Sequence, residues 1–371
     1  MKKELKEKNV EKVKKEKIEN SNNKVIISAV VTFVICAVLF GIFYEFYLKN
    51  LVIETTRIEK DVTVTDKGIA DAVEKIYDSV VVVETYNNGV IHSTGTGFVF
   101  KKENGKGYIL TNYHVIDGGA EVKVIFTNEE SVVTEVVGGD QRADTAVLSV
   151  PEDKVISVSN LGNSEDLRIG DTTFAVGAPI DSTTYSWTVT RGILSGKNRI
   201  IELPINDREK IIMELLQTDT AINSGNSGGP LCNSNGEVIG VTNSKLDSSQ
   251  IEGIAFAIPI ETALEYANKF INGEEVKRPY IGISIYDSNS FLGMNEGVII
   301  DEVLEDSPAE KAGLKKGDKI LKVNDKEVKD TSYFLYELYK YEVGEEVTIT
   351  IERDKKEKDI KVVLGTQSEN V

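Results

Sequence analysis

Histidine, cysteine and net positive charge are all scarce in this sequence, and each shortage limits the chemistry available to the protein. The 371 residues include only two histidines, His92 and His114, so a reaction that needs an imidazole base has two candidates. The two cysteines, Cys36 and Cys232, lack the neighbouring His and Cys residues of a metal site. The formal net charge of -17 argues against nucleic acid as a partner, because phosphate contacts need clustered Lys and Arg.

Long uncharged runs are also rare, and the one at residues 25–44 predicts a transmembrane helix. These 20 residues contain no charged side chain, and at ~1.5 Å per residue a helix of this length spans ~30 Å, the thickness of a hydrocarbon core. A cleaved signal peptide would have a shorter apolar run and a cleavage site of small residues. The alternative, a buried helix of a soluble protein, fits poorly with so uniform an apolar surface. We therefore expect an uncleaved anchor.

The charges on either side of this span set its predicted orientation. Residues 1–24 carry nine Lys and five Glu, a solvated arm with a net charge of +4. Lysines before the span and acidic residues after it place the N-terminus in the cytoplasm and the bulk of the chain outside it. Residues 45–68 show no core pattern and are interpreted as a stalk. Because Cys36 lies inside the span, it cannot pair with Cys232, which we interpret as a small buried hydrophobe.

Residues 225–230, Gly-Asn-Ser-Gly-Gly-Pro, predict a serine nucleophile set in its own oxyanion hole. A serine hydroxyl attacks poorly unless a base takes its proton and donors stabilise the developing oxyanion. Gly225, Asn226 and Ser227 form the predicted oxyanion loop, with the backbone N–H groups of Gly225 and Ser227 as donors. Glycine at position 225 permits the unusual torsions that turn an amide toward the site. The alternative is a simple Gly/Asn/Ser turn between two strands.

A candidate base and a candidate carboxylate precede this motif in the chain. Residues 108–116 form a short apolar strand that ends at His114, and Asp144 precedes the apolar run 145–148. The spacings are 30 residues from His114 to Asp144 and 83 from Asp144 to Ser227. The order His, Asp, Ser is that of chymotrypsin-like double barrels. His92 lies in a polar stretch without a partner motif, and we interpret it as a surface or strand histidine.

Four segments together resemble the HtrA (high-temperature-requirement A, Deg-type) family of serine proteases. They are Thr-Gly-Thr-Gly-Phe at 94–98, Thr-Asn-Tyr-His-Val at 111–115, Asp-Thr-Ala-Val-Leu at 144–148 and Gly-Asn-Ser-Gly-Gly-Pro-Leu at 225–231. The resemblance extends from about residue 69 to the end of the chain. Two departures from the family pattern, Thr145 and Ser224, remove no catalytic group.

The pattern of elements predicts a mainly β fold. An amphipathic helix at 69–78 is followed by many short strands separated by Gly-containing turns, and no strand alternates with long helices, which excludes a parallel α/β sheet. We expect a chymotrypsin-like double β-barrel of two antiparallel six-stranded barrels at residues 69–260. A linker containing a helix follows at 261–276, and a small α+β PDZ domain occupies 277–366.

The expected mechanism is that of a Ser-His-Asp peptidase. Ser227 attacks the peptide carbonyl, His114 moves the proton, and Asp144 orients the imidazole and stabilises the imidazolium. This acid–base chemistry needs no metal, and we expect no cofactor. Mobility of the oxyanion loop would provide a switch, because losing one oxyanion donor costs about 10²–10³ in rate in a comparable protease.

The resemblance also implies a specificity pocket. In trypsin-like relatives its base lies six residues before the nucleophile, here Ala221 with Ile222 beside it, and the opposing wall comes from Gly253, Ile254 and Ala255. No acidic residue lies at this pocket base, so we expect cleavage after small or medium aliphatic residues. Asn243 and Ser244 are the predicted edge segment that pairs with the substrate backbone.

The C-terminal region resembles a bacterial PDZ domain. Tyr280, Ile281, Gly282 and Ile283 correspond to the carboxylate-binding loop, where backbone N–H groups near Gly282 hold a peptide C-terminus and the peptide adds as a strand along 283–285. Ser-Pro-Ala-Glu-Lys-Ala-Gly at 307–313 carries the capping pattern of a short helix. A second helix near 332–341 would form the other wall of the groove.

The leading hypothesis is therefore a membrane-anchored serine endopeptidase that degrades or processes misfolded or signalling proteins outside the cytoplasm, as in protein quality control under stress. Its PDZ domain would bind peptide C-termini and regulate it. The resemblance further implies a homotrimer or larger homo-oligomer, with the apolar residues of 69–77 as candidate contacts. The alternative is a proteolytically inactive PDZ scaffold or chaperone on a protease fold, which would not need the triad or Gly225.

Overall fold

The computed structural model describes residues 28–44, 66–177, 187–204, 210–243, 253–289 and 295–366. The chain divides into two compact units, residues 1–63 and 64–371. In the first unit the described part is a helix over residues 28–43, with residue 44 continuing it. Across the described residues, no helix combines the length and apolar character needed to cross a membrane. Residues 25–27 of the predicted span lie outside the described residues.

The second unit begins with the amphipathic helix α3 (Asp66–Tyr77). Ile69, Ala72 and Ile76 are buried against the protein's own core, whereas Tyr77 is 37% exposed. Burying one apolar stripe is the usual reason for an amphipathic surface helix to dock. The prediction that residues 69–77 supply oligomer contacts is therefore wrong for Ile69 and Ile76, which the chain itself covers. Tyr77, at the end of the helix, remains on the surface.

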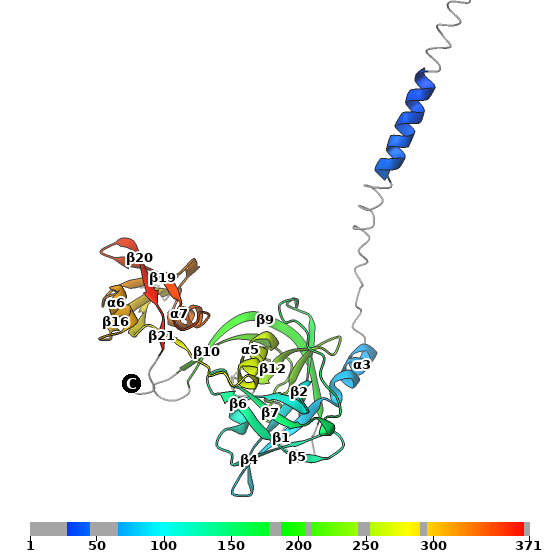
Figure 1. The fold of residues 1–371 in the computed structure, drawn as a ribbon, viewed down its shortest axis with the longest axis horizontal. Helices are drawn as coiled ribbons and strands as arrows, with labels where there is room; N and C mark the ends of the chain where they lie inside the picture. Colours follow the sequence, from blue (N-terminus) through cyan, green and yellow to red (C-terminus); the bar gives the residue numbers. More distant parts are fainter. Residues whose placement is uncertain are drawn as a thin grey trace, which may run out of the picture. The chain divides into compact units, whose positions relative to one another are not determined.

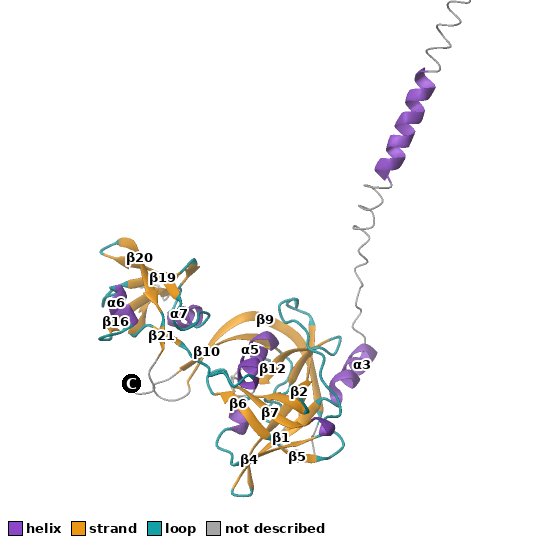
Figure 2. Cartoon of the chain, in the orientation of Figure 1, coloured by secondary structure: helices purple, strands orange, loops and turns teal. Residues whose placement is uncertain are grey.

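The first β domain is a seven-stranded antiparallel sheet of order β5-β4-β1-β2-β3-β7-β6. Figures 1 and 2 show its strands β1, β4 and β5 side by side. Its strands are β1 (Val80–Asn87), β2 (Val90–Glu103), β3 (Lys106–Thr111), β4 (Glu121–Ile125), β5 (Ser131–Val133), β6 (Glu135–Asp140) and β7 (Thr145–Pro151). β5 and β6 are separate strands, because Thr134 between them leaves the sheet pattern. The domain thus has one strand more than the predicted six-stranded barrel.

The second β domain is a closed barrel of order β10-β13-β12-β11-β8-β9, as predicted. Its strands are β8 (Thr172–Gly177), β9 (Thr188–Pro204), β10 (Lys210–Thr218), β11 (Pro230–Asn233), β12 (Val238–Asn243) and β13 (Ala255–Pro259). Closure leaves no free sheet edge inside the barrel. Cys232 on β11 is fully buried, and this burial raises the pKa of its thiol. The interpretation of Cys232 as a small buried hydrophobe is confirmed.

One hydrophobic core joins the two β domains and both flanking helices. It contains Phe98 and Val147 of the first domain, Phe174 and Ile258 of the second, and side chains of α3. The helix α5 (Ile260–Ile271) closes it through residues that include Ala263, Ala267 and Phe270. Because a single core is shared, the two domains form a fixed frame across which a site can be assembled.

The C-terminal region has a core of its own, which includes Val298, Ile320, Phe334 and Ile349. Its main sheet has the order β15-β16-β17-β19-β20, with β18 paired to β17, and β14 pairs with β21. The strands are β14 (Pro279–Tyr280), β15 (Ile283–Asn289), β16 (Asn295–Val303), β17 (Lys319–Val323), β18 (Lys326–Glu327), β19 (Glu346–Arg353), β20 (Lys356–Val363) and β21 (Gly365–Thr366). Two helices, α6 (Pro308–Ala312) and α7 (Thr331–Leu338), complete it.

The capping pattern read from the sequence holds in α6. The Ser307 side chain accepts the N–H of Glu310, Pro308 opens the helix, and Gly313 ends it in the left-handed conformation at φ 88°. These are the residue types that helix ends favour for satisfying free backbone groups. The chain therefore turns sharply at each end of α6, which packs near β20.

Candidate active site

The loop that carries Ser227 is shaped by two glycines in the left-handed region. Gly225 has φ 103° and Gly228 has φ 82°, conformations that cost a side-chain-bearing residue energy. A Cβ on Gly228 would also lie 2.3 Å from both the Thr96 carbonyl oxygen and Thr111 Oγ1. Ser227 itself is 3% exposed. Position 228 therefore admits only glycine, for reasons of torsion and of space.

Hydrogen bonds from both β domains hold this loop. The Thr96 N–H on β2 donates to the Ser227 carbonyl at 2.8 Å, and Thr96 Oγ1 donates to the Gly225 carbonyl at 2.6 Å. From the barrel, the Gly228 N–H donates to the Thr242 carbonyl at 2.9 Å. Thr242 Oγ1 donates in turn to the Asn226 carbonyl at 2.5 Å. Both β domains thus hold the Ser227 loop in place.

His114 lies one turn after β3, in the short helix α4 (Tyr113–Ile116). Its Nδ1 lies 2.7 Å from Asp144 Oδ2, and its backbone N–H donates to Asp144 Oδ1 at 2.9 Å. With Nδ1 donating to the carboxylate, Nε2 is the nitrogen left to accept a proton. The two bonds together set the position and the tilt of the imidazole.

Gly95 and Gly228 allow the His114 segment to pack against the Ser227 loop. A Cβ on Gly95 would meet Val115, the residue after His114, at 2.7 Å and the Ser227 carbonyl oxygen at 3.0 Å. A Cβ on Gly228 would lie 2.9 Å from the Asn112 nitrogen. The residues flanking His114 and the residues flanking Ser227 therefore pack directly on one another. His92, by contrast, lies exposed on β2, as predicted.

Asp144 is buried, with 5% exposure, and has a positive φ of 45°. Asn112 Nδ2 donates to the backbone carbonyl of Asp144 at 2.8 Å. Asn243 Nδ2, at the end of β12, donates to Asp144 Oδ2 at 2.7 Å. Burying polar oxygens without hydrogen-bond partners costs free energy, and these donors satisfy them. Asn243 belongs to the segment predicted to pair with the substrate backbone, and that pairing stays a prediction. Its side chain also supports the carboxylate, a role for which the sequence offered no signal.

The predicted specificity residues come from two separate elements. Ala221 is exposed and Ile222 is buried on the loop before Ser227, and the Ala221 carbonyl accepts from Thr190 Oγ1 at 2.7 Å. Gly253 and Ile254 lead into β13, where Ala255 pairs with Thr218 of β10. Ser244 lies outside the described residues. Asn226 is buried and reaches the Ala221 carbonyl through Nδ2 at 3.4 Å, which links the oxyanion loop to the predicted pocket base.

The predicted peptide-binding loop of the C-terminal domain starts at β14 and ends at β15. Gly282 has φ 80°, and a Cβ there would lie 2.3 Å from the Cβ of Ser307. The carbonyls of Ile281 and Gly282 accept the N–H groups of Ala309 and Leu304, each at 2.9 Å. Ile281 is buried, Tyr280 is half-buried, and Ile283 begins β15, the first strand in the sheet order.

Comparison with known proteins now identifies the class and the family. Residues 95–241 match a trypsin-like peptidase domain, and residues 279–364 match a PDZ domain. Serine protease Do-like HtrA of Bacillus subtilis (strain 168) is 40% identical over 290 residues, covering 74% of this chain and 64% of that protein. Serine protease Do-like HtrB of the same organism is 36% identical over 331 residues, covering 82% and 72%. The chain belongs to the HtrA family of serine proteases.

Solved structures agree with this assignment. The HtrA-type protease AlgW with tripeptide has a TM-score of 0.67 and 30% identity, covering 81% of this chain and 97% of that one. The serine endoprotease from Yersinia pestis has a TM-score of 0.63 and 31% identity, covering 81% and 98%. The mainly β protease fold followed by a PDZ domain is therefore confirmed.

Asn243→Ala should lower kcat without unfolding the protein. It removes one donor from the buried Asp144 carboxylate, and a hydrogen bond to a charged group contributes about 1.5–3 kcal/mol, or about ten- to a hundredfold in rate if the whole term acts in the transition state. Steady-state kinetics on a small peptide ester checks this. Asn233→Ala is the matched control, because Asn233 Nδ2 donates to Glu237 Oε2 at 2.7 Å outside the site. Equal losses of kcat in the two variants would contradict the assignment.

Proposed function

We propose that this protein is a serine endopeptidase in which Ser227 is the nucleophile, His114 the general base and Asp144 the orienting carboxylate. The observation that carries the proposal is the pair of bonds from His114 to Asp144, at 2.7 and 2.9 Å, beside a loop that presents Ser227. Such a pair holds Nε2 as the acceptor for the serine proton. The N–H groups of Gly225 and Ser227 stabilise the oxyanion, with Asn226 supporting the loop between them.

Replacement of Ser227 by Ala in the full chain tests the proposal. Hydrolysis of casein should fall by several orders of magnitude, since loss of the nucleophile costs ~10⁶ in kcat in a comparable protease. Ser224→Ala is the matched control: Ser224 is exposed in the same loop, and its loss should leave the rate unchanged. Wild-type protein that binds casein but leaves it intact would favour the inactive scaffold instead.

We infer that the enzyme cleaves after small or medium aliphatic residues. Ala221 and Ile222 supply no charge at the proposed pocket base, and the nearby Asp219 is exposed and accepts the Ile193 N–H at 2.6 Å. A Lys or Arg side chain would therefore enter without a counter-charge, at a desolvation cost. Ile254 and Ala255 make the opposing wall apolar.

Mapping of cleavage sites in a denatured proteome checks this specificity. Valine and alanine should dominate immediately before the cut bond, whereas a preference for lysine would refute the proposed pocket.

We also infer that peptide C-termini bind at Gly282 and along β15 and so regulate turnover. Repeating the digestion with a free C-terminal peptide added tests this regulation. Binding of the peptide with no change in rate would contradict that regulation.

We also propose that residues 25–44 anchor the chain in a membrane with the protease and PDZ domains outside the cytoplasm. The run of 20 uncharged residues after a basic arm supports this. So do the described side chains of this segment: Val30, Phe33 and Phe40 are all more than half exposed. A helix that is apolar on every side needs an apolar environment.

Alkaline extraction of membranes tests the anchor. The full chain should stay in the membrane pellet, and a chain that begins at residue 45 should be released to the supernatant. Release of both chains would contradict the anchor and would leave the peptidase proposal untouched.

Misfolded or signalling proteins outside the cytoplasm are the substrates that such a location favours. The homotrimer, or a larger homo-oligomer, stays a prediction from the family resemblance.

A further inference from the structure

A partly buried ion pair joins Arg278, the residue just before the matched PDZ segment at 279–364, to the turn that carries Asp144. Arg278 Nη2 donates to Asp140 Oδ1 at 2.6 Å, and Nη1 donates to Oδ2 at 3.0 Å. The two side chains are only 19% and 14% exposed. A bidentate guanidinium–carboxylate pair fixes the orientation of its partners as well as their distance. Arg278 therefore constrains the geometry of Asp140 in addition to balancing its charge.

Asp140 in turn shapes the backbone that leads to Asp144. It is the last residue of β6 and pairs with Thr145 of β7. Its Oδ1 also accepts the Ala143 N–H at 2.7 Å. Asp144 then follows with φ 45°, a conformation that a residue other than glycine keeps only when its surroundings enforce it. One carboxylate thus binds Arg278 on one side and the residue before Asp144 on the other.

The electrostatics of the pair favour the charged forms. Burial by itself raises the pKa of Asp140, but the Arg278 guanidinium and the backbone N–H groups of Ala143 and Arg142 outweigh it and hold the pKa below its ordinary value. Breaking the pair would leave a largely buried carboxylate with fewer donors, which is strongly unfavourable. The turn would then have to open toward water.

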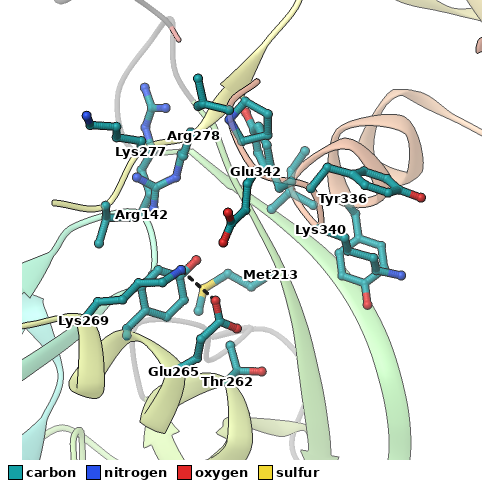
Figure 3. Close-up of a pocket in the computed structure, with 18 of the residues that line it drawn as sticks. Arg142, Met213, Thr262, Glu265, Lys269, Lys277, Arg278, Tyr336, Lys340 and Glu342 are labelled. Carbon is teal, nitrogen blue, oxygen red and sulfur yellow. Dashed lines mark hydrogen bonds and ion pairs between the residues drawn. The ribbon is translucent and has the colours of Figure 1, made fainter. Parts of the chain in front are cut away.

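The linker helix α5 holds the same strand from another side. Phe270 lies so close to Gly138 on β6 that a Cβ on the glycine would be 2.8 Å from it. After α5, the chain reaches Arg278 along the wall of a cavity of about 570 Å³, which Figure 3 shows with Arg278, Arg142 and Met213 among its lining residues. Val276, two residues earlier, packs against the shared hydrophobic core. The ion pair with Asp140 adds a directional contact at the point where the segment reaches the Asp144 turn.

We propose that Arg278 is a positioning residue for the peptidase reaction: through Asp140 it holds the Asp144 turn in the geometry that binds His114. The inference rests on the function proposed above. Arg278 lies outside both the matched trypsin-like domain and the matched PDZ domain. The residues that determine activity would therefore extend beyond these two domains.

Kinetics of full-chain variants on a small peptide substrate test this role. Arg278→Gln should lower kcat by about ten- to a hundredfold with little change in KM, because misplacement of a catalytic group by about 1 Å costs up to ~10² in rate. Arg278→Lys, which keeps the charge and one donor, should recover part of the loss. Asp140→Asn should also lower kcat, and the double variant should be no slower than the slower single one, since both act through one contact.

The matched control is Arg353→Gln. Arg353 binds Asp318 through two bonds of 2.6 Å inside the PDZ domain, with side-chain exposures of 21% and 1%, and contacts no residue of the Asp144 turn. Its loss should leave kcat unchanged. A folded Arg278→Gln protein with wild-type kcat, or an equal loss of kcat in Arg353→Gln, would overturn the proposal.

Hydrogen exchange separates this inference from the peptidase proposal. In Arg278→Gln the Ala143 N–H should exchange faster than in the wild type, and in Arg353→Gln it should not. If the wild-type chain hydrolyses nothing, the proposed function fails, and the Ala143 exchange rate still decides the coupling. An unchanged exchange rate of the Ala143 N–H in a folded Arg278→Gln protein would overturn the proposed coupling.

Discussion

The buried carboxylate of Asp144 is the group on which the rest of the site depends. Its oxygens bind the ring and the backbone N–H of His114 and the side-chain amide of Asn243. Its backbone has a positive φ, which the neighbouring turn and Asn112 maintain. Asn243 and Asn112 orient the imidazole indirectly, because the imidazole takes its direction from the carboxylate. Loss of the carboxylate's position would leave a histidine with no fixed tautomer.

Close approach between two β domains is the second requirement. His114 and Asp144 lie in connections of the first β domain and Ser227 lies in a loop of the second, so the site exists only where the domains touch. Thr96 donates across this boundary to both Gly225 and Ser227, and glycines at 95 and 228 leave no space for a side chain between the two surfaces. The shared hydrophobic core supplies the free energy that keeps the boundary closed. Catalytic geometry and domain packing are therefore one property of the fold.

The sequence predicted the parts of this arrangement that are locally encoded. The Gly-Asn-Ser-Gly-Gly-Pro segment and the strand before His114 carry their chemistry in short runs, and short strands separated by Gly-containing turns indicate the mainly β fold. The supports of Asp144 are different. Asn243 lies 99 residues from Asp144 and Arg278 lies 138 residues from Asp140, and each is a common polar residue at the end of an element. Nothing near them in the sequence distinguishes them from solvated side chains, because their partners are determined by tertiary packing alone.

The central claim is that folding activates one serine hydroxyl out of many. Covalent labelling with a fluorophosphonate, followed by peptide mass spectrometry, measures this directly, because the reagent reports a hydroxyl with a base and an oxyanion hole beside it. The account predicts one adduct per chain, located on Ser227, and its loss in a folded His114→Ala variant. An unlabelled wild-type protein, or adducts spread over exposed serines and unaffected by His114, would contradict it.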